Sequence, residues 1–261
     1  MLGYIIYEDT EGKKDYINRH IQYMKEKGVQ LELVMLDELR YKHTPDFAIM
    51  RAIAPNVSKS LENKGVRVFN NSLVSEICND KLKTYLLMKE NGIIYPTLYK
   101  KTEEITQYPV VVKSRNGHGG TEVFKADNRD EAERYLHRLE GRGLIQQFVD
   151  TPGKDLRVYV IGDKIVGAML RKSTTDFRSN FCLGGSASVY KLSKSEEELT
   201  KRISSLLKFD YVGIDFIFHR GKIIFNEIED VVGSRMLYTY TDIDIVKIYV
   251  DYILKEMKWI F

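Results

Sequence analysis

Three carboxylates that lie close together in the sequence, Asp215, Glu227 and Glu229, are its strongest indication of chemistry. Their hard oxygen ligands suit Mg²⁺ or Mn²⁺. Neighbouring residues such as Ile214 and Phe225 are apolar and resemble a protein core, which favours a metal site. The alternative is that the three acids line a solvated face of a sheet.

The runs 212–218 and 222–229 predict an antiparallel hairpin around these acids. Side chains alternate along a strand, so Glu227 and Glu229 point to the same face. Asp215 joins them only if the hairpin register has the right parity.

The parity depends on the turn. A two-residue turn at Arg220 and Gly221, with regular pairing beyond it, sends Asp215 to the opposite face. A three-residue loop that starts at His219 places the acids on a common face and requires Gly221 at positive φ. We therefore predict the three-residue loop.

A second candidate site is a glycine-rich loop, 114–121, which contains Gly117, Gly119 and Gly120 and follows Lys113. Glycines let backbone amides approach phosphate oxygens, and the lysine supplies a positive charge. The loop lacks the Walker A spacing, and an ordinary hairpin turn is the alternative.

A third group combines Arg157, Arg171, Arg178 and Asn180, with Asp155 just upstream of Arg157. The planar guanidinium group suits carboxylates and phosphates. Taken singly, each arginine is equally consistent with a surface ion pair.

Composition narrows the function classes. The 261 residues predict roughly two compact units at about 150 residues each. Forty Lys and Arg against 37 Asp and Glu give a net charge of +3, too small to indicate nucleic-acid or membrane binding. Cys78 and Cys182 lie far apart, with no metal-binding cluster, and no secretory or membrane-spanning segment is evident. We expect a cytoplasmic protein.

Strands that alternate with helices in the first seventy residues predict βαβ units and a parallel sheet. The predicted strands are Tyr4–Tyr7, Val29–Val34, Phe47–Arg51 and Val66–Phe69, with one helix ending at Gly28 and another over Ser58–Lys64.

The remaining chain predicts helices mixed with antiparallel strands. The predicted helices are Asn79–Asn91, Arg129–Leu139, Ser195–Leu207 with a capping box of Ser195 and Glu198, and Asp242–Met257. The predicted strands are Pro109–Lys113, Glu122–Lys125 and Leu144–Val149, followed by strand pairs around Gly162 and Gly221.

Six motifs follow one another in unbroken order over about 150 residues: Asn79–Lys81, Tyr108–Lys113 with its glycine loop, Ile145–Val149, Gly153–Arg157, Phe177–Asn180, and Gly213–Asp215 followed by Asn226–Glu229. In this order the chain resembles the ATP-grasp carboxylate-amine ligases, most closely their RimK-like branch. The resemblance implies an ATP-grasp α/β (α+β) fold. Its expected parts are an N-terminal βαβ domain (1–75), a small lid subdomain with a linking helix (76–147) and a C-terminal α+β domain with the metal site (148–261).

The resemblance also implies roles for individual residues. The residues implied to bind ATP are Lys81 and Lys113 at the phosphates, Gly119 and Gly120 in the loop, Gln146, Gln147, Phe148 and Val149 at adenine, Asp155 at the ribose, and Arg157. The implied metal ligands, for Mg²⁺ or Mn²⁺, are Asp215, Glu227 and Glu229, and the implied catalytic residues are Arg171, Arg178 and Asn180.

The implied reaction forms an amide or peptide bond through an acyl phosphate and releases ADP and phosphate. The expected substrates are a carboxylate and an amine, as amino acids or peptides, and a homo-oligomer is an open option. In one departure from the family, Glu229 stands where Asn is usual. Two alternatives are a carboxylate kinase with a non-amine acceptor and an ATP-binding regulatory module without turnover.

Overall fold

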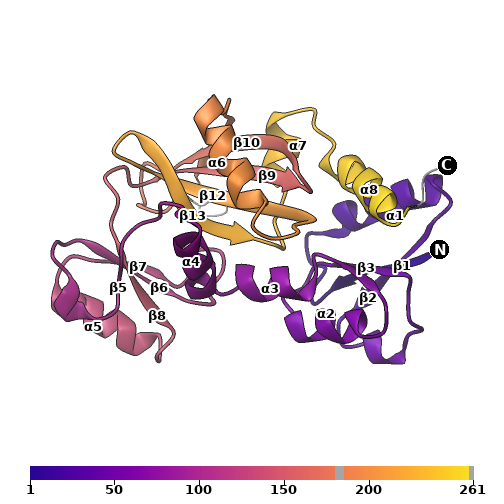
Figure 1. Ribbon diagram of the computed structural model, residues 1–261, viewed down its shortest axis with the longest axis horizontal. Coiled ribbons are helices and arrows are strands. Elements are labelled where there is room, and N and C mark those ends of the chain that lie inside the picture. The colour runs from indigo at the N-terminus through magenta and orange to yellow at the C-terminus, as the bar shows by residue number, and fades with distance from the viewer. Residues whose placement is uncertain (180–184, 259–261) are drawn as a thin grey trace.

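The structure, a computed structural model, describes residues 1–179 and 185–258. Its strands form three separate sheets, which follow one another along the chain (Figure 1). One sheet is parallel and two are antiparallel, which confirms the mixed α/β and α+β architecture expected from the sequence.

The N-terminal sheet is parallel, with the strand order β2-β1-β3-β4. Its elements are β1 (Leu2–Tyr7), α1 (Lys14–Glu26), β2 (Gln30–Met35), the 3₁₀ turn η1 (Leu39–Tyr41), β3 (Phe47–Met50), α2 (Pro55–Glu62) and β4 (Arg67–Phe69). Because parallel strands end at the same edge, Tyr7 and Arg51 come together at the carboxyl edge of this sheet.

Two helices connect this sheet to the rest of the molecule. The first, α3 (Ser72–Cys78), was not predicted, although Asn71 caps it by accepting a hydrogen bond from the Val74 amide at 2.9 Å. The second, α4 (Lys81–Glu90), begins two residues later than expected. Asp80 is its N-cap and accepts from the backbone amides of residues 82 and 83.

The second sheet is small and antiparallel, in the order β5-β8-β6-β7. Its elements are β5 (Leu98–Tyr99), the 3₁₀ turn η2 (Thr102–Glu104), β6 (Val110–Ser114), β7 (Val123–Ala126), α5 (Arg129–Arg138) and β8 (Gly143–Gln147). Helix α5 packs on the sheet and buries Ala132 against Val110 and Val112. This unit lies at the end of the molecule farthest from the N-terminal sheet (Figure 1).

The third sheet is antiparallel, in the order β11-β10-β9-β12-β13. Its elements are β9 (Lys154–Ile161), β10 (Lys164–Lys172), β11 (Ser186–Val189), α6 (Lys194–Ser204), β12 (Tyr211–His219), β13 (Lys222–Glu229), α7 (Arg235–Tyr240) and α8 (Ile245–Glu256). Tyr159 and Tyr211 join the N-terminal core, where α8 packs beside α1 (Figure 1). Val158 and Ile214, on the opposite face, belong to a different core cluster.

The structure corrects two predictions about the later helices. The capping box consists of Ser193 and Glu196 rather than Ser195 and Glu198, so α6 begins one residue before the predicted start. The predicted last helix, Asp242–Met257, starts at Ile245, and the short helix α7 before it was missed.

The prediction of a three-residue hairpin loop was wrong, although Gly221 does have a positive φ of 73°. His219 pairs with Lys222, which leaves a two-residue turn in which Arg220 also has a positive φ, of 50°. Both central residues of a type I′ turn require positive φ, and this turn matches the right-handed strand twist. The pairing beyond the turn is not regular, because a β-bulge follows on β13.

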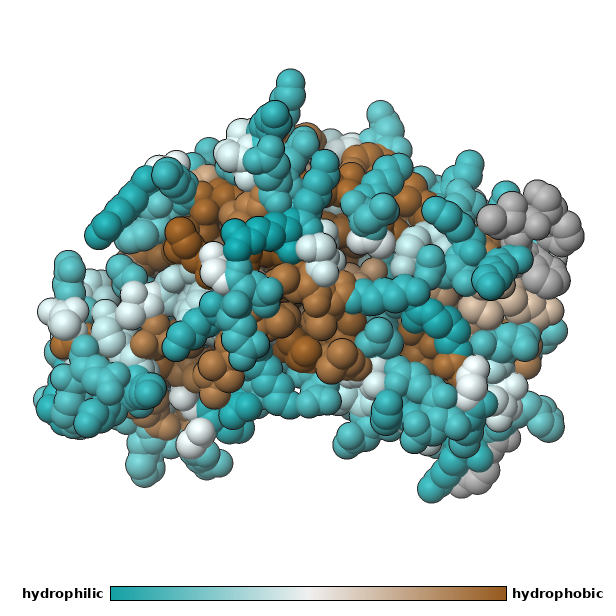
Figure 2. Space-filling view, in the orientation of Figure 1, coloured by the Kyte–Doolittle hydropathy of each residue, from teal (hydrophilic) through white to brown (hydrophobic). Residues whose placement is uncertain are grey.

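Hydrophilic side chains cover most of the face shown in Figure 2, with hydrophobic ones gathered near its middle, where α3 and α4 lie. Leu73 and Leu86 are exposed large hydrophobic residues of these helices. Among the residues that the structure describes, no helix is long and apolar enough to cross a membrane.

Candidate functional site

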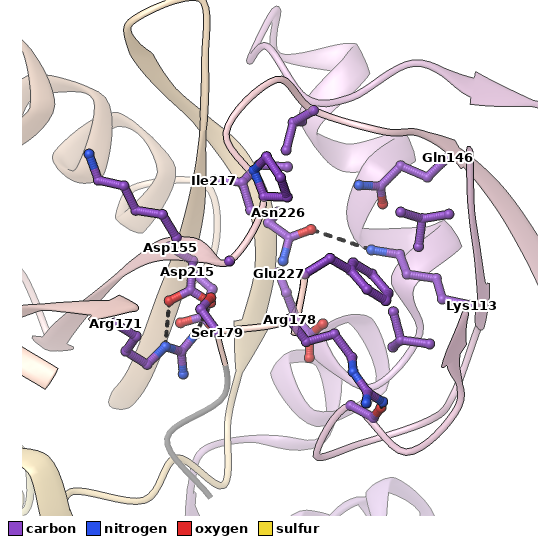
Figure 3. Close-up of a pocket in the computed structure, with 18 of the residues that line it drawn as sticks. Lys113, Gln146, Asp155, Arg171, Arg178, Ser179, Asp215, Ile217, Asn226 and Glu227 are labelled. Atoms are coloured by element: carbon purple, nitrogen blue, oxygen red, sulfur yellow. Dashed lines mark hydrogen bonds and ion pairs between the residues drawn. The ribbon is translucent and has the colours of Figure 1, made fainter. Parts of the chain in front are cut away.

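A cleft of about 900 Å³, including the space open to solvent, lies between the small antiparallel sheet and the C-terminal sheet. All the residues expected at the site line it, apart from Asn180, which lies outside the described residues (Figure 3). They are Lys81, Lys113, Gly119, Gly120, Gln146, Gln147, Phe148, Val149, Asp155, Arg157, Arg171, Arg178, Asp215, Glu227 and Glu229.

Lys113 lies on β6 and is buried at the base of the cleft. Its Nζ donates to the Tyr85 hydroxyl at 2.8 Å and to Asn226 Oδ1 at 3.4 Å (Figure 3). Burial lowers the pKa of Lys113 to about 7; Glu227 opposes this shift and Lys81 adds to it. Among the residues that the structure describes, no carboxylate forms an ion pair with the Lys113 ammonium group, and an anion entering the cleft would supply that partner.

Lys81 reaches the same cleft from the first turn of α4. Its Nζ donates to the Gly117 carbonyl at 2.5 Å and lies 3.6 Å from Glu227 Oε2. Asp80, its neighbour and the helix cap, forms a bidentate pair with Arg115. The helix start and the glycine loop are thus fixed to one another.

The glycine loop also contacts the C-terminal domain. Arg178 donates to the Gly120 carbonyl at 2.7 Å and forms an ion pair with Asp176. Gly153, at φ 68°, allows the segment that leads to Arg178 to pack closely against it, because a Cβ at this position would lie 2.6 Å from the Ser173 carbonyl oxygen. The loop that carries Arg178 therefore closes over one end of the cleft.

The segment expected at adenine forms another wall of the cleft. Gln146 is buried on β8, and its Oε1 accepts from the Tyr85 hydroxyl at 3.0 Å. Phe148 follows the strand and contacts Phe177, with ring centroids 5.8 Å apart. Two aromatic rings beside a hydrogen-bonding strand suit a flat heteroaromatic base.

A buried ion network occupies the floor of the cleft on the C-terminal sheet. Arg157 donates to both oxygens of Asp215, at 2.7 and 2.6 Å, and also to Glu229. Arg171 bridges Asp155 and Asp215 (Figure 3). Burial would raise the pKa of Asp215, but the two arginines outweigh it and hold that pKa below its ordinary value.

The bulge on β13 decides which acids share this face. Phe216 pairs with Phe225, whereas Asp215 pairs with Glu227, so Asn226 is the extra residue. The bulge shifts the register by one residue, which offsets the two-residue turn and places Glu227 opposite Asp215. Asn226 itself is directed into the cleft (Figure 3).

These residues fit a divalent cation only in part. Within the described part of the chain, Glu227 forms its one ion pair with Lys81, at 3.6 Å, and one oxygen of Glu229 accepts a hydrogen bond from Arg157. Both oxygens of Asp215 already accept hydrogen bonds from arginines. Within residues 1–179 and 185–258, no group of three His, Cys, Asp or Glu side chains is placed to hold a metal ion. The expected three-carboxylate site is therefore not preformed, while Glu227 and Glu229 have the right chemistry.

Sequence reasoning missed four polar residues that line the cleft: Thr151, Lys154, Ser179 and Asn226. Lys154, Ser179 and Asn226 lie inside the quoted motifs but were given no role. Lys154 lies directly before Asp155, and its Nζ is 4.0 Å from the centroid of the Phe218 ring. Only the strand register shows that Asn226 faces the cleft, because a regular strand would place it on the opposite face from Glu227.

A model of the RimK-like ATP-grasp domain matches residues 79–253, more than half of the chain. The chain belongs to the RimK-like ATP-grasp family. It is 30% identical to "Probable alpha-L-glutamate ligase 2" of Hahella chejuensis, over 77% of this chain and 71% of that protein.

Two solved structures share the fold. A RimK domain ATP-grasp protein from Sphaerobacter thermophilus superposes with a TM-score of 0.77 at 19% identity, over 97% of this chain and all of that one. The ATP-grasp ligase PsnB, in a complex with Mg and ADP, superposes with a TM-score of 0.73 at 15% identity, over 98% of each chain. As a RimK-like ATP-grasp ligase, the chain joins a carboxylate to an amine in an ATP-dependent, ADP-forming reaction.

Proposed function

We propose that the cleft binds ATP with Mg²⁺ and joins an amino acid or peptide carboxylate to an amine through an acyl phosphate. One observation carries this proposal: two buried lysines on separate elements, Lys81 and Lys113, converge on the same space as the carboxylates of β12 and β13. Phosphoryl transfer depends mainly on positioning and charge neutralisation, which such a cleft can supply.

In this proposal the two lysines and the glycine loop bind the phosphates. Gln146, Gln147, Phe148 and Val149 line the adenine pocket, and Asp155 contacts the ribose. PsnB, whose solved complex contains ADP and Mg, supports this use of the fold. We also propose the division into an N-terminal domain (1–75), a lid with its linking helix (76–147) and a C-terminal domain (148–261).

We propose that Glu227 and Glu229 hold Mg²⁺, with Asp215 as the third carboxylate of the same face. A bound magnesium ion would neutralise phosphate charge and orient the phosphates. Arg157 also donates a hydrogen bond to Glu229, which offsets the charge of the carboxylate that stands where the family usually has Asn. Arg157 and Arg171 keep Asp215 charged, as the lowered pKa of Asp215 indicates.

The proposed reaction has two steps, a phosphoryl transfer and an amide formation. A carboxylate oxygen of the substrate attacks the γ-phosphorus of ATP, so that ADP leaves and an acyl phosphate forms. The amine then attacks the acyl carbon, phosphate leaves, and the amine loses a proton. Arg171, Arg178 and Asn180 are the proposed catalytic residues. Arg178 has to exchange its present partner, Asp176, for an anion in the cleft.

Measurement of ADP release tests the function. Purified protein would be supplied with Mg-ATP and a panel of amino acids and short peptides, and products would be identified by mass spectrometry. We expect ADP release that requires both a carboxylate and an amine. The product should have the summed mass of the two substrates less one water molecule. ADP release that needs a carboxylate but no amine would instead indicate the carboxylate kinase.

The metal assignment is tested by Glu227→Gln, which removes one charge and little volume. We expect a folded protein whose turnover falls roughly 100-fold or more. Glu122→Gln is the matched control, because Glu122 pairs with Arg142 on the lid. ADP release by Glu227→Gln at the wild-type rate would refute the assignment.

A further inference from the structure

Arg51 directly follows β3, at the carboxyl edge of the N-terminal sheet, and faces the C-terminal domain. Its Nη2 donates to the Val232 carbonyl at 2.8 Å, and its guanidinium lies 5.3 Å from the centre of the Tyr16 ring. Its Nε is buried without a hydrogen-bond partner. Among the described residues, no carboxylate forms an ion pair with Arg51. The Arg51 side chain as a whole is half-buried, and a charge that is partly withdrawn from water normally has such a partner.

Burial raises the pKa of Asp230, and the nearby charge of Arg51 opposes that shift only in part. Asp230 does not approach Arg51 as an ion-pair partner. Its Oδ1 instead accepts a hydrogen bond from Asn79 at 2.9 Å. The positive charge of Arg51 is therefore left uncompensated within the described part of the chain.

Three tyrosine hydroxyls beside Arg51, those of Tyr7, Tyr16 and Tyr211, are also buried and make no well-formed hydrogen bond among the described residues. The hydroxyls of Tyr16 and Tyr211 interact only weakly with one another and with Ser234. Tyr7 and Tyr211 are only 2% and 1% exposed. Buried polar atoms without partners are uncommon, and several of them around one cation point to a missing acceptor. A carboxylate could accept hydrogen bonds from both the guanidinium and the hydroxyls.

This cluster adjoins the ion network of the cleft. A Cβ at Gly213 would lie 2.6 Å from Val232 Cγ2 and 3.5 Å from Arg157 Cδ, so both side chains pack over this glycine. Gly213 also pairs with Tyr159, two residues along β9 from Arg157. Val232 therefore links the two groups, because its carbonyl accepts from Arg51 and its side chain packs over Gly213 beside Arg157.

We propose that Arg51 binds a carboxylate of the substrate that does not react, with the hydroxyls of Tyr7, Tyr16 and Tyr211 as additional donors. The inference rests on the proposed ligase function, because it assumes that the reacting carboxylate lies beside the Arg157 network. The substrate class is then an amino acid or peptide that carries a second free carboxylate, and Arg51 is a specificity residue.

Equilibrium binding tests this without requiring turnover. L-glutamate, L-aspartate and L-glutamyl-L-glutamate would be titrated calorimetrically into wild type, Arg51→Lys and Arg51→Met, each loaded with Mg-ADP. We expect Arg51→Met to weaken binding of the best ligand roughly tenfold to a hundredfold, because a charged bidentate partner is lost. Arg51→Lys should recover part of the loss, since it keeps the charge but not the planar fork.

Arg19→Met is the matched control. Arg19 also lies on the N-terminal domain and over a tyrosine ring, that of Tyr238, but it has an acid partner in Asp244 at 2.9 Å. We expect it to leave ligand affinity within about twofold of wild type. L-glutamine and the α-amide of glutamic acid, titrated in parallel, identify which carboxylate Arg51 binds.

The melting temperature separates binding from a structural role. Removing a half-buried charge that has no ion-pair partner among the described residues should leave the melting temperature of Arg51→Met unchanged or raised. Unchanged ligand affinity in Arg51→Met, or no binding of any of the three ligands to wild type, would overturn the proposal. If binding is lost in Arg51→Met while wild type releases no ADP with any mixture, the subsite stands and the ligase chemistry fails.

Discussion

Binding of ATP should weaken as the pH rises, because Lys113 must be protonated to attract phosphate. In the free protein, burial lowers the pKa of Lys113 to about 7, from 10.5 for an unperturbed lysine. The groups that face Lys113 are Tyr85 on α4, Lys81 at the start of α4, and Glu227 and Asn226 on β13. A phosphate placed against Nζ favours the charged form and so raises this pKa.

The magnitude follows from proton linkage. If the bound pKa returns towards its ordinary value, binding above about pH 7 takes up one proton, and the Kd for ATP rises up to tenfold per pH unit. Between about pH 7 and pH 9 this amounts to roughly a 50-fold loss of affinity, or about 2.3 kcal/mol. The folding stability of the ATP-free protein should change with pH in the opposite direction from its affinity for ATP. Because the folded-state pKa of Lys113 is depressed, this residue contributes stability that increases as the pH rises from about 7 towards 10.5.

Isothermal titration of Mg-ATP at several pH values, in buffers of different ionisation enthalpy, measures both the Kd and the protons taken up. Wild type should take up nearly one proton at about pH 8.5. Lys113→Met should bind weakly with little pH dependence, whereas Lys101→Met, which removes an exposed lid lysine, should retain the wild-type slope. A flat Kd and no proton uptake in wild type would refute the placement of phosphate against Lys113.

Three further predictions concern stability, mobility and binding. Asp210→Asn removes the charge that pairs with Arg67 at 2.5 Å. Asp210 is fully buried but Arg67 is 25% exposed, so urea unfolding should show a loss of about 1.5–3 kcal/mol, the contribution of a hydrogen bond between charged groups, and a loss below about 0.5 kcal/mol would contradict this. Amide hydrogen exchange in the glycine loop 116–120 should slow when Mg-ATP is added, because its glycines have the most backbone freedom to lose, and unchanged exchange would count against a lid. Lys81→Met should weaken ATP binding by more than the roughly 1 kcal/mol of an exposed ion pair, since Lys81 is only 6% exposed. Calorimetry that finds an unchanged Kd would show that Lys81 does not contact the phosphates.

Features set by neighbours in the sequence were predictable. The alternation of strands and helices in the N-terminal domain depends on local periodicity, and the structure contains it. The helix expected from Asn79 is also present, but it begins two residues later because Asp80 is its N-cap. Helix α3 was missed because its seven residues are too few for a clear helical period. Strand β11 was missed because its four residues carry little apolar patterning.

Contacts between distant elements could not be predicted in the same way. The pairing of Arg157 with Asp215 requires β9 and β12 to adopt one particular register, and nothing near either residue in the sequence specifies it. Arg51 was absent from the predicted site for the same reason. Its unpartnered Nε becomes visible only when Val232 and the tyrosines of other elements close around it.

In the hairpin of β12 and β13, Asp215 and Glu227 share a face as predicted, although the predicted turn was wrong. The requirement that Asp215 and Glu227 share a face demands one extra residue somewhere between them, and the sequence allowed that residue to lie in the turn. The structure places it in the strand, as the bulge at Asn226. The difference matters for function, because an extra residue in the turn would leave Asn226 on the opposite face, whereas the bulge directs it to Lys113, at 3.4 Å. The same irregularity therefore aligns the acids and adds a polar contact to the buried lysine, which explains why the regular two-residue turn is compatible with the site.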